Sequence, residues 1–139
     1  MKHIVRLMSL LLSLLCIFSL CSCSKEAGTL SIDYVNDSSH DIQFEGSRSG
    51  DLPKGTTLRM SDSAIGCIPK PNDLWRGTSF IVYDNSVKIH VDMTIRPLGV
   101  LEYRKNYETV ESTPEYLHLR YTFTDADYQY ALEHGTLIE

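Results

Sequence analysis

The alternation of hydrophobic and polar residues divides most of the chain into short segments with a period of two, which is typical of β-strands. In the first segment Leu30, Ile32 and Tyr34 fall on one face. Ile42 and Phe44 resume the same alternation after a polar turn. These two segments predict a β-hairpin.

Five further segments predict strands, because they either alternate or are apolar on both faces. They are residues 58–60, 80–83, 87–93, 98–103 and 117–123.

The segments between these strands contain residues that favour turns and loops. Residues 46–51 and 61–78 show no period and predict loops, the second of them long. Residues 52–55 have proline in the second position and glycine in the fourth, which predicts a type I turn. Asp84 and Asn85 tolerate the positive φ of a tight hairpin turn.

The period changes after the last strand and predicts one helix. Thr124 and Asp127 form a capping pattern, Asp125 adds a second carboxylate at the positive end of the helix dipole, and Gly135 stands where a helix stops. Its apolar face, which we expect to pack on the core, consists of Tyr128, Ala131 and Leu132.

The order of these elements predicts one all-β domain at residues 29–139. About seven strands without helices between them are typical of an antiparallel immunoglobulin-like β-sandwich, or of a barrel, here with one short C-terminal helix.

The first 22 residues have the pattern of a cleaved export signal. Lys2 and Arg6 precede an apolar stretch at residues 7–20, which is shorter than the ~20 residues of a spanning helix. The stretch ends in Leu-Cys-Ser-Cys at residues 20–23, which looks like the lipobox of a bacterial lipoprotein. We therefore expect Cys23 to become the N-terminus and to carry diacylglycerol and a further acyl chain such as palmitate.

These acyl chains would attach the protein to a membrane through a short linker at residues 23–28. Ser24 follows the cysteine, which favours the outer membrane of the cell envelope and leaves the leaflet open. We expect this covalent lipid on Cys23 and no cofactor.

Charge and cysteine content exclude two classes of protein. The signal holds two of the 13 basic residues and none of the 18 acidic ones, so the mature chain has a net charge of −7. Such a chain repels phosphate backbones, and we expect no nucleic-acid partner. Cys67 is the only thiol left after processing, so the domain must be stabilised by core packing rather than by an internal disulfide.

Several motifs together carry a resemblance to a family. After the lipobox come Asn-Asp-Ser-Ser-His-Asp-Ile at 36–42, Leu-Pro-Lys-Gly-Thr at 52–56, a hairpin at 83–85 and Tyr-Thr-Phe-Thr-Asp-Ala-Asp-Tyr at 121–128. This series resembles small uncharacterised lipoproteins of Bacteroides-type gut bacteria, although their hairpin has a glycine that is absent here. The resemblance implies an envelope location and a β-sandwich, and no catalytic residues.

No motif predicts catalysis or a metal site. His90 and Asp92 share a strand face, as do His118 and Arg120, which could together hold an anion; an ordinary polar sheet face explains both pairs. Asp125 and Asp127 could be a calcium pair, but the start of one helix explains both. We therefore expect no enzymatic activity and no bound metal.

Two loop positions are candidates for modification and binding. Asp-Ser-Ala at 62–64 matches a short O-glycosylation pattern, with Ser63 as the acceptor. An interaction surface is predicted at Asp73, Leu74, Trp75 and Arg76, because Trp and Arg are common at binding hot spots. The alternative is that Trp75 folds back to cap the core.

Three functions are compatible with these patterns. The first is a non-enzymatic envelope module that binds a protein or glycan partner or helps to build an assembly. The second is a small envelope hydrolase that unites His90 or His118 with a carboxylate and a nucleophile. The third is a fimbrial or surface-assembly subunit with a removable N-terminal strand.

Overall fold

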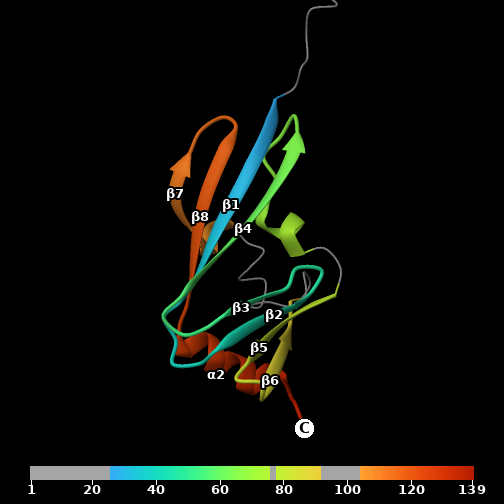
Figure 1. Ribbon diagram of the computed structural model, residues 1–139, viewed down its shortest axis with the longest axis vertical. Coiled ribbons are helices and arrows are strands. Elements are labelled where there is room, and N and C mark those ends of the chain that lie inside the picture. Colours follow the sequence, from blue (N-terminus) through green and yellow to red (C-terminus); the bar gives the residue numbers. More distant parts are fainter. Residues whose placement is uncertain (1–25, 76–77, 92–103) are drawn as a thin grey trace, which may run out of the picture.

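The computed structural model describes residues 26–75, 78–91 and 104–139. Nine strands in this part of the chain form two sheets, which are followed by one short C-terminal helix (Figure 1). The predicted all-β class with a C-terminal helix is confirmed. Neither sheet closes into a barrel within the described residues.

The first sheet has the strand order β4-β1-β8-β7. Its strands are β1 (Ala27–Asn36), β4 (Thr57–Ile65), β7 (Glu108–Ser112) and β8 (Tyr116–Phe123). The pairs β1–β4 and β7–β8 are antiparallel, whereas β1 and β8 are parallel. A purely antiparallel sandwich was therefore the wrong prediction. A parallel pair needs a long connection, and here most of the domain lies between the two strands.

The second sheet has the order β3-β2-β5-β6-β9, and all its pairs are antiparallel. Its strands are β2 (Ile42–Gly46), β3 (Gly50–Leu52), β5 (Ser79–Tyr83), β6 (Val87–His90) and β9 (Thr136–Leu137). The predicted tight turn between β5 and β6 is confirmed, since Asp84 and Asn85 have φ of 49° and 53°. Residues 92–103, including the predicted strand 98–103, lie outside the described residues.

The predicted hairpin of β1 and β2 is wrong, because the two strands belong to different sheets. The buried side chain of Asn36 holds the chain where it crosses over. Its Nδ2 donates to the carbonyls of His40 and Leu52, at 2.8 Å each, and its Oδ1 accepts from the backbone N–H and the hydroxyl of Ser38. These bonds fix a connection between sheets in place of a two-stranded turn.

Two predicted loops contain regular structure. Residues 61–65 continue β4 because they pair with β1, although residues 61–64 are polar or small on both faces. The same predicted loop contains the 3₁₀ helix η1 (Pro71–Trp75), and β3 begins inside the predicted loop 46–51. Polar strand residues and short edge strands lack the apolar pattern on which the prediction depended.

The predicted type I turn is displaced by one residue. The N–H of Thr56 donates to the carbonyl of Pro53, and Gly55 has φ of 73°. The turn therefore comprises residues 53–56 with glycine in the third position, where a type II turn requires positive φ.

The predicted helix is confirmed as α2 (Asp125–His134), with a capping box between Thr124 and Asp127. Ala131 is fully buried and Tyr128 packs against the core, as predicted. Leu132 is 41% exposed, so its predicted contact with the core is wrong. The helix ends before Gly135, where an added Cβ would meet the carbonyl oxygens of Ala131 and Lys88.

One core joins the two sheets, and its centre is aromatic. Tyr34 of β1 packs against Phe44 of β2, Phe123 of β8, Trp75 of η1 and Tyr107. Tyr107 follows a second 3₁₀ helix, η3 (Arg104–Asn106). Burial raises the pKa of Tyr34 to about 12, so its hydroxyl stays protonated.

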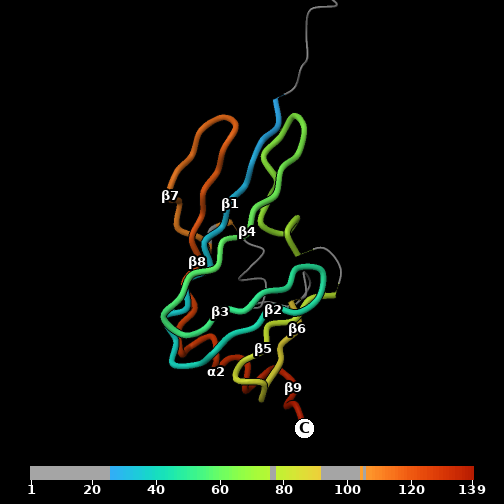
Figure 2. The backbone as a smooth tube through the Cα atoms, in the orientation of Figure 1, coloured from blue at the N-terminus to red at the C-terminus, as the bar shows by residue number. Residues whose placement is uncertain are grey.

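The molecule is elongated, and β1 enters at one end while the C-terminus lies at the other (Figure 2). The second sheet and α2 occupy the C-terminal end. The strands β1, β4, β7 and β8 extend beyond them toward the N-terminal end (Figure 1). The outer face of the first sheet is therefore a long surface that no other element of the described residues covers in this view.

Candidate functional site

The outer face of the first sheet is built from alternate residues of its strands. On β1, Leu30, Ile32 and Tyr34 point into the core, so Ser31 and Asp33 point outward. Both are nevertheless buried, at 6% exposure each, because side chains of the two neighbouring strands cover them. A carboxylate with so little exposure needs partners.

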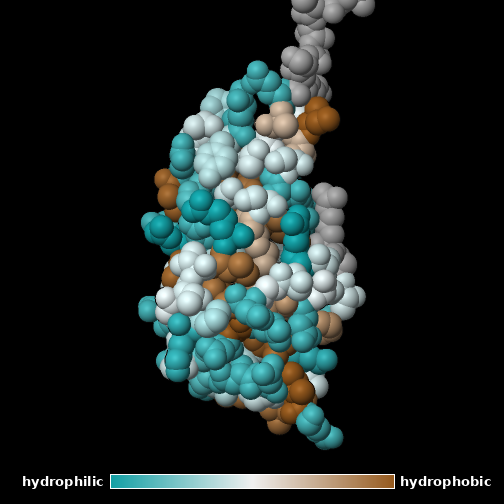
Figure 3. Space-filling model, in the orientation of Figure 1, coloured by the Kyte–Doolittle hydropathy of each residue, from teal (hydrophilic) through white to brown (hydrophobic). Residues whose placement is uncertain are grey.

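The strand register places polar side chains in three rows across β4, β1 and β8. Each row contains one residue of each strand, in that order: Ser63, Thr29 and Tyr116; Ser61, Ser31 and His118; Arg59, Asp33 and Arg120. In the space-filling view, the surface over these strands is mostly hydrophilic (Figure 3).

Asp33 lies at the centre of a charged cluster with Arg59 and His118. Its Oδ1 accepts from Nε of Arg59 at 2.6 Å, and its Oδ2 accepts from Nη2 of Arg59 at 3.0 Å. Nε2 of His118 lies 2.8 Å from the same Oδ2. The hydrogen bonds from Arg59, and then that from His118, hold the pKa of Asp33 below its usual range despite its burial.

The other two rows carry paired hydroxyl groups. Ser31 and Ser61 have their Oγ atoms 2.9 Å apart, and Thr29 Oγ1 lies 3.1 Å from Ser63 Oγ. The half-buried ring of Tyr116 lies beside that of His118, with 6.2 Å between the ring centroids. Each hydroxyl pair has fixed orientations and retains lone pairs for a further hydrogen bond.

The arrangement contains part of a hydrolytic relay. His118 and Asp33 make the base-and-carboxylate half of a hydrolytic relay, and Ser31 is the register partner of His118. A serine nucleophile must contact the histidine, however, and the hydroxyl of Ser31 contacts that of Ser61.

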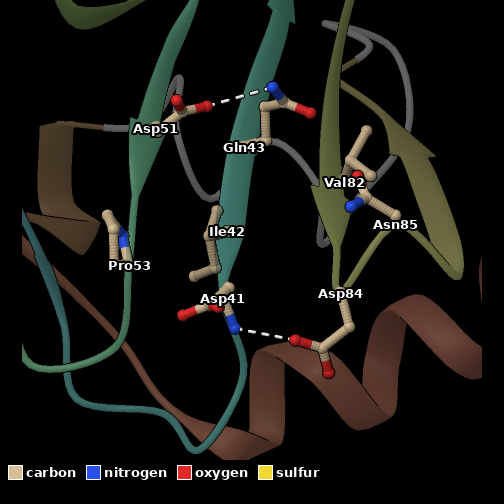
Figure 4. Close-up of a pocket in the computed structure, with 8 residues that line it drawn as sticks. All are labelled: Asp41, Ile42, Gln43, Asp51, Pro53, Val82, Asp84 and Asn85. Atoms are coloured by element: carbon tan, nitrogen blue, oxygen red, sulfur yellow. Dashed lines mark hydrogen bonds between the residues drawn. The ribbon is translucent and has the colours of Figure 1, made fainter.

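A second candidate is a hollow of about 520 Å³ on the second sheet, shown in Figure 4. It is lined by residues of β2, β3, β5 and the adjoining turns: Asp41, Ile42, Gln43, Asp51, Pro53, Val82, Asp84 and Asn85. Three carboxylates line this hollow, so it could in principle be a site that binds a cation.

The carboxylates of this hollow are used within the protein. Asp84 accepts from the N–H of Asp41 and contacts Nδ1 of His40 at 2.6 Å, which lowers the pKa of Asp84. Asp41 accepts from the N–H of Lys54, and Asp51 accepts from Gln43. In the described residues, no group of three or more His, Cys, Asp and Glu side chains could hold a metal ion. We therefore assign these groups a structural role.

The predicted interaction loop is placed mostly in the core. Leu74 and Trp75 are each 1% exposed, and Nε1 of Trp75 donates to the hydroxyl of Tyr34 at 3.1 Å. Asp73 accepts from the N–H of Lys70, and Arg76 lies outside the described residues. The burial of Trp75 favours the alternative in which it caps the core.

The structure describes the predicted glycosylation site and one of the two cysteines expected in the mature chain. Ser63 is exposed, but it lies on the edge strand β4 instead of in a loop. Cys67 is exposed and, among the described residues, forms no disulfide. Cys23 lies outside the described residues.

The other predicted pairs make contacts with different partners. His118 contacts Asp33 and Arg120 contacts Glu108, so each already has a carboxylate partner. His90 packs edge-on against Phe80, and Asp92 lies outside the described residues.

The two aspartates at the start of α2 make separate contacts. Asp125 accepts from the N–H and hydroxyl of Ser39, while Asp127 accepts from Thr124 in the capping box and from the hydroxyl of Tyr121. These contacts agree with a helix start rather than a calcium pair.

Comparison with known proteins adds no assignment, since the chain matches no family model, no curated protein and no solved structure. In the described part of the chain, no helix is both long and apolar enough to cross a membrane.

Proposed function

We propose that this chain is a lipid-anchored module of the bacterial cell envelope that binds a partner through the outer face of its first sheet. The observation that carries the proposal is the Asp33–Arg59–His118 cluster. Desolvating such a cluster costs free energy that apolar residues of similar size would not cost. Its benefit is that Asp33 orients an arginine that remains 58% exposed and therefore accessible to a ligand.

The anchor is supported by the sequence. The signal pattern and lipobox predict a lipid on Cys23, and β1 begins at Ala27, so only three residues separate the two. The domain would stand close to the outer membrane. We further propose that its two sheets, which share one core, are an immunoglobulin-like sandwich of the kind used by many binding modules.

In-cell photo-crosslinking of the full-length lipoprotein tests this function. A photoreactive amino acid at Tyr116 should trap a specific envelope component, whereas the same amino acid at Glu45, an exposed residue of β2, should not. Identical products from both positions, or none from either, would exclude a binding role for the outer face.

One observation favours a hydrolase as the second candidate, namely the contact between His118 and Asp33. A hydrolase would require the hydroxyl of Ser31 to turn from Ser61 toward the imidazole. A fluorophosphonate probe should then label the wild type and not Ser31→Ala. Under the proposed binding function, neither protein is labelled.

A further inference from the structure

We propose that the ligand of the outer face is a neutral glycan chain. This inference rests on the proposed function and specifies its ligand class. It depends on the charge balance of the face, on its paired hydroxyl groups and on the position of the aromatic ring of Tyr116.

The charge balance argues against an anionic or cationic ligand. Both arginines of the face already contact a carboxylate, Arg59 that of Asp33 and Arg120 that of Glu108, at 3.5 Å in the second case. Glu111 of β7 aligns with His118 and adds a third carboxylate. The face therefore has no excess cation for an acidic ligand, and because its two arginines nearly balance its three carboxylates, it has little excess charge to attract a basic one.

The hydrogen-bonding groups suit a ligand that carries many hydroxyls. The exposed guanidinium of Arg59 can only donate, whereas the serine and threonine hydroxyls can both donate and accept. Because Thr29–Ser63 and Ser31–Ser61 are already paired, their remaining lone pairs have fixed directions. A sugar offers donors and acceptors on one molecule without charge, which matches this mixture.

Tyr116 supplies the apolar contact that a sugar also needs. Its half-buried ring lies at the end of the Thr29 row and next to His118. An aromatic ring packs against the C–H face of a sugar while its hydroxyl remains solvated. From the Thr29 row to the Asp33 row the strands rise about 13 Å, enough for two sugar units along the sheet.

The test uses the full-length lipidated protein in detergent micelles and a panel of immobilised oligosaccharides. The neutral probes are maltohexaose, cellohexaose, laminarihexaose and mannohexaose, and the acidic probe is oligogalacturonate. The wild type should bind at least one neutral probe with a Kd below roughly 1 mM. Tyr116→Ala and Arg59→Lys should each weaken binding about tenfold or more, and Glu45→Ala should bind like the wild type.

Arg59→Lys keeps the positive charge but removes the bidentate contact with Asp33. Circular dichroism verifies that each variant is folded. Binding to oligogalacturonate alone, or to no neutral probe at about 1 mM, overturns the inference. If no neutral oligosaccharide binds but crosslinks from position 116 still trap an envelope protein, the glycan assignment is wrong and the proposed function stands. If both experiments fail, the proposed function fails too.

Discussion

At the scale of single residues, Asp33 has the most constrained environment on the outer face. Its carboxylate is nearly inaccessible and makes three hydrogen bonds, two with Arg59 and one with His118. Removal of its charge would leave Arg59 without an anionic partner and would weaken the hydrogen bond with His118. The cluster therefore depends on the ionised form of Asp33.

Replacement of Asp33 by asparagine should lower stability at neutral pH and change its pH dependence. Since hydrogen bonds to charged groups contribute about 1–3 kcal/mol, we expect Asp33→Asn to lower the free energy of unfolding at pH 7 by a similar amount. Because the pKa of Asp33 is lowered by folding from its unfolded value of 3.8, this contribution is present above that pH. It is lost as the pH falls through the folded pKa.

Urea unfolding between pH 7 and pH 2 measures this effect. The variant should lose less stability on acidification than the wild type. Asp37→Asn is the matched control, because Asp37 is exposed, and it should behave like the wild type. An Asp33→Asn variant as stable as the wild type at pH 7 would show that the cluster does not stabilise the fold.

Trp75 provides the second prediction at this scale. It is among the largest fully buried side chains, and Trp75→Ala should cost about 3–5 kcal/mol. Trp75→Phe should cost less, because an aromatic ring still fills part of the site, although the hydrogen bond to Tyr34 is lost. Thermal unfolding compares both with Lys70→Ala, an exposed neighbour. A small change in melting temperature for Trp75→Ala would instead favour the predicted interaction surface at residues 73–76.

At the scale of elements, β1 organises the fold. It is central in its sheet and supplies Leu30, Ile32 and Tyr34 to the core, all fully buried. In a fimbrial subunit the removable N-terminal strand would have to be β1. Its removal would expose the edges of β4 and β8 that pair with it and would empty part of the core, so a replacement strand would need apolar residues at the same alternate positions.

The contacts of α2 give a prediction at this scale. Ala131 is fully buried against the core, so Ala131→Leu should overpack the core and cost about 1–3 kcal/mol. Leu132 is the adjacent residue on the exposed side, and Leu132→Ala should change stability by no more than about 0.5 kcal/mol. Chemical denaturation measures both. Equal effects would mean that the helix does not dock through Ala131.

The elements differ in how far they could be predicted from the sequence. The hairpin of β5 and β6 and the start of α2 are determined by neighbouring residues, so the pattern of Asp84 and Asn85 or of Thr124 and Asp127 was sufficient. The Asp33 cluster combines residues 33, 59 and 118. Alternation could place each on an outward face, but only the strand order, with its parallel pair, brings them together.

At the scale of the whole molecule, the long axis relates the anchor to the rest of the domain. Chain entry and C-terminus lie at opposite ends (Figure 1). Cys67 lies near the entry: the N–H of Gly66 donates to the carbonyl of Glu26, and Cys67 packs against Gly28. Ser86 lies near the other end, where its carbonyl accepts from Ile138. A lipid on Cys23 would therefore hold Cys67 near the membrane and Ser86 far from it.

Thiol labelling tests this orientation and the position of the lipid together. In membrane vesicles, the exposed Cys67 of the wild type should react several-fold more slowly with a bulky polyethylene glycol maleimide than the thiol of a Cys67→Ser, Ser86→Cys variant. The reason is that the bilayer hinders a large reagent at the anchored end. With residues 24–139 produced without a signal or lipid, the two thiols should react at similar rates, since both positions are exposed. Equal labelling rates in vesicles would mean that the anchor is not at Cys23. A disulfide between Cys67 and another cysteine of the same chain would show that a second cysteine is retained after processing.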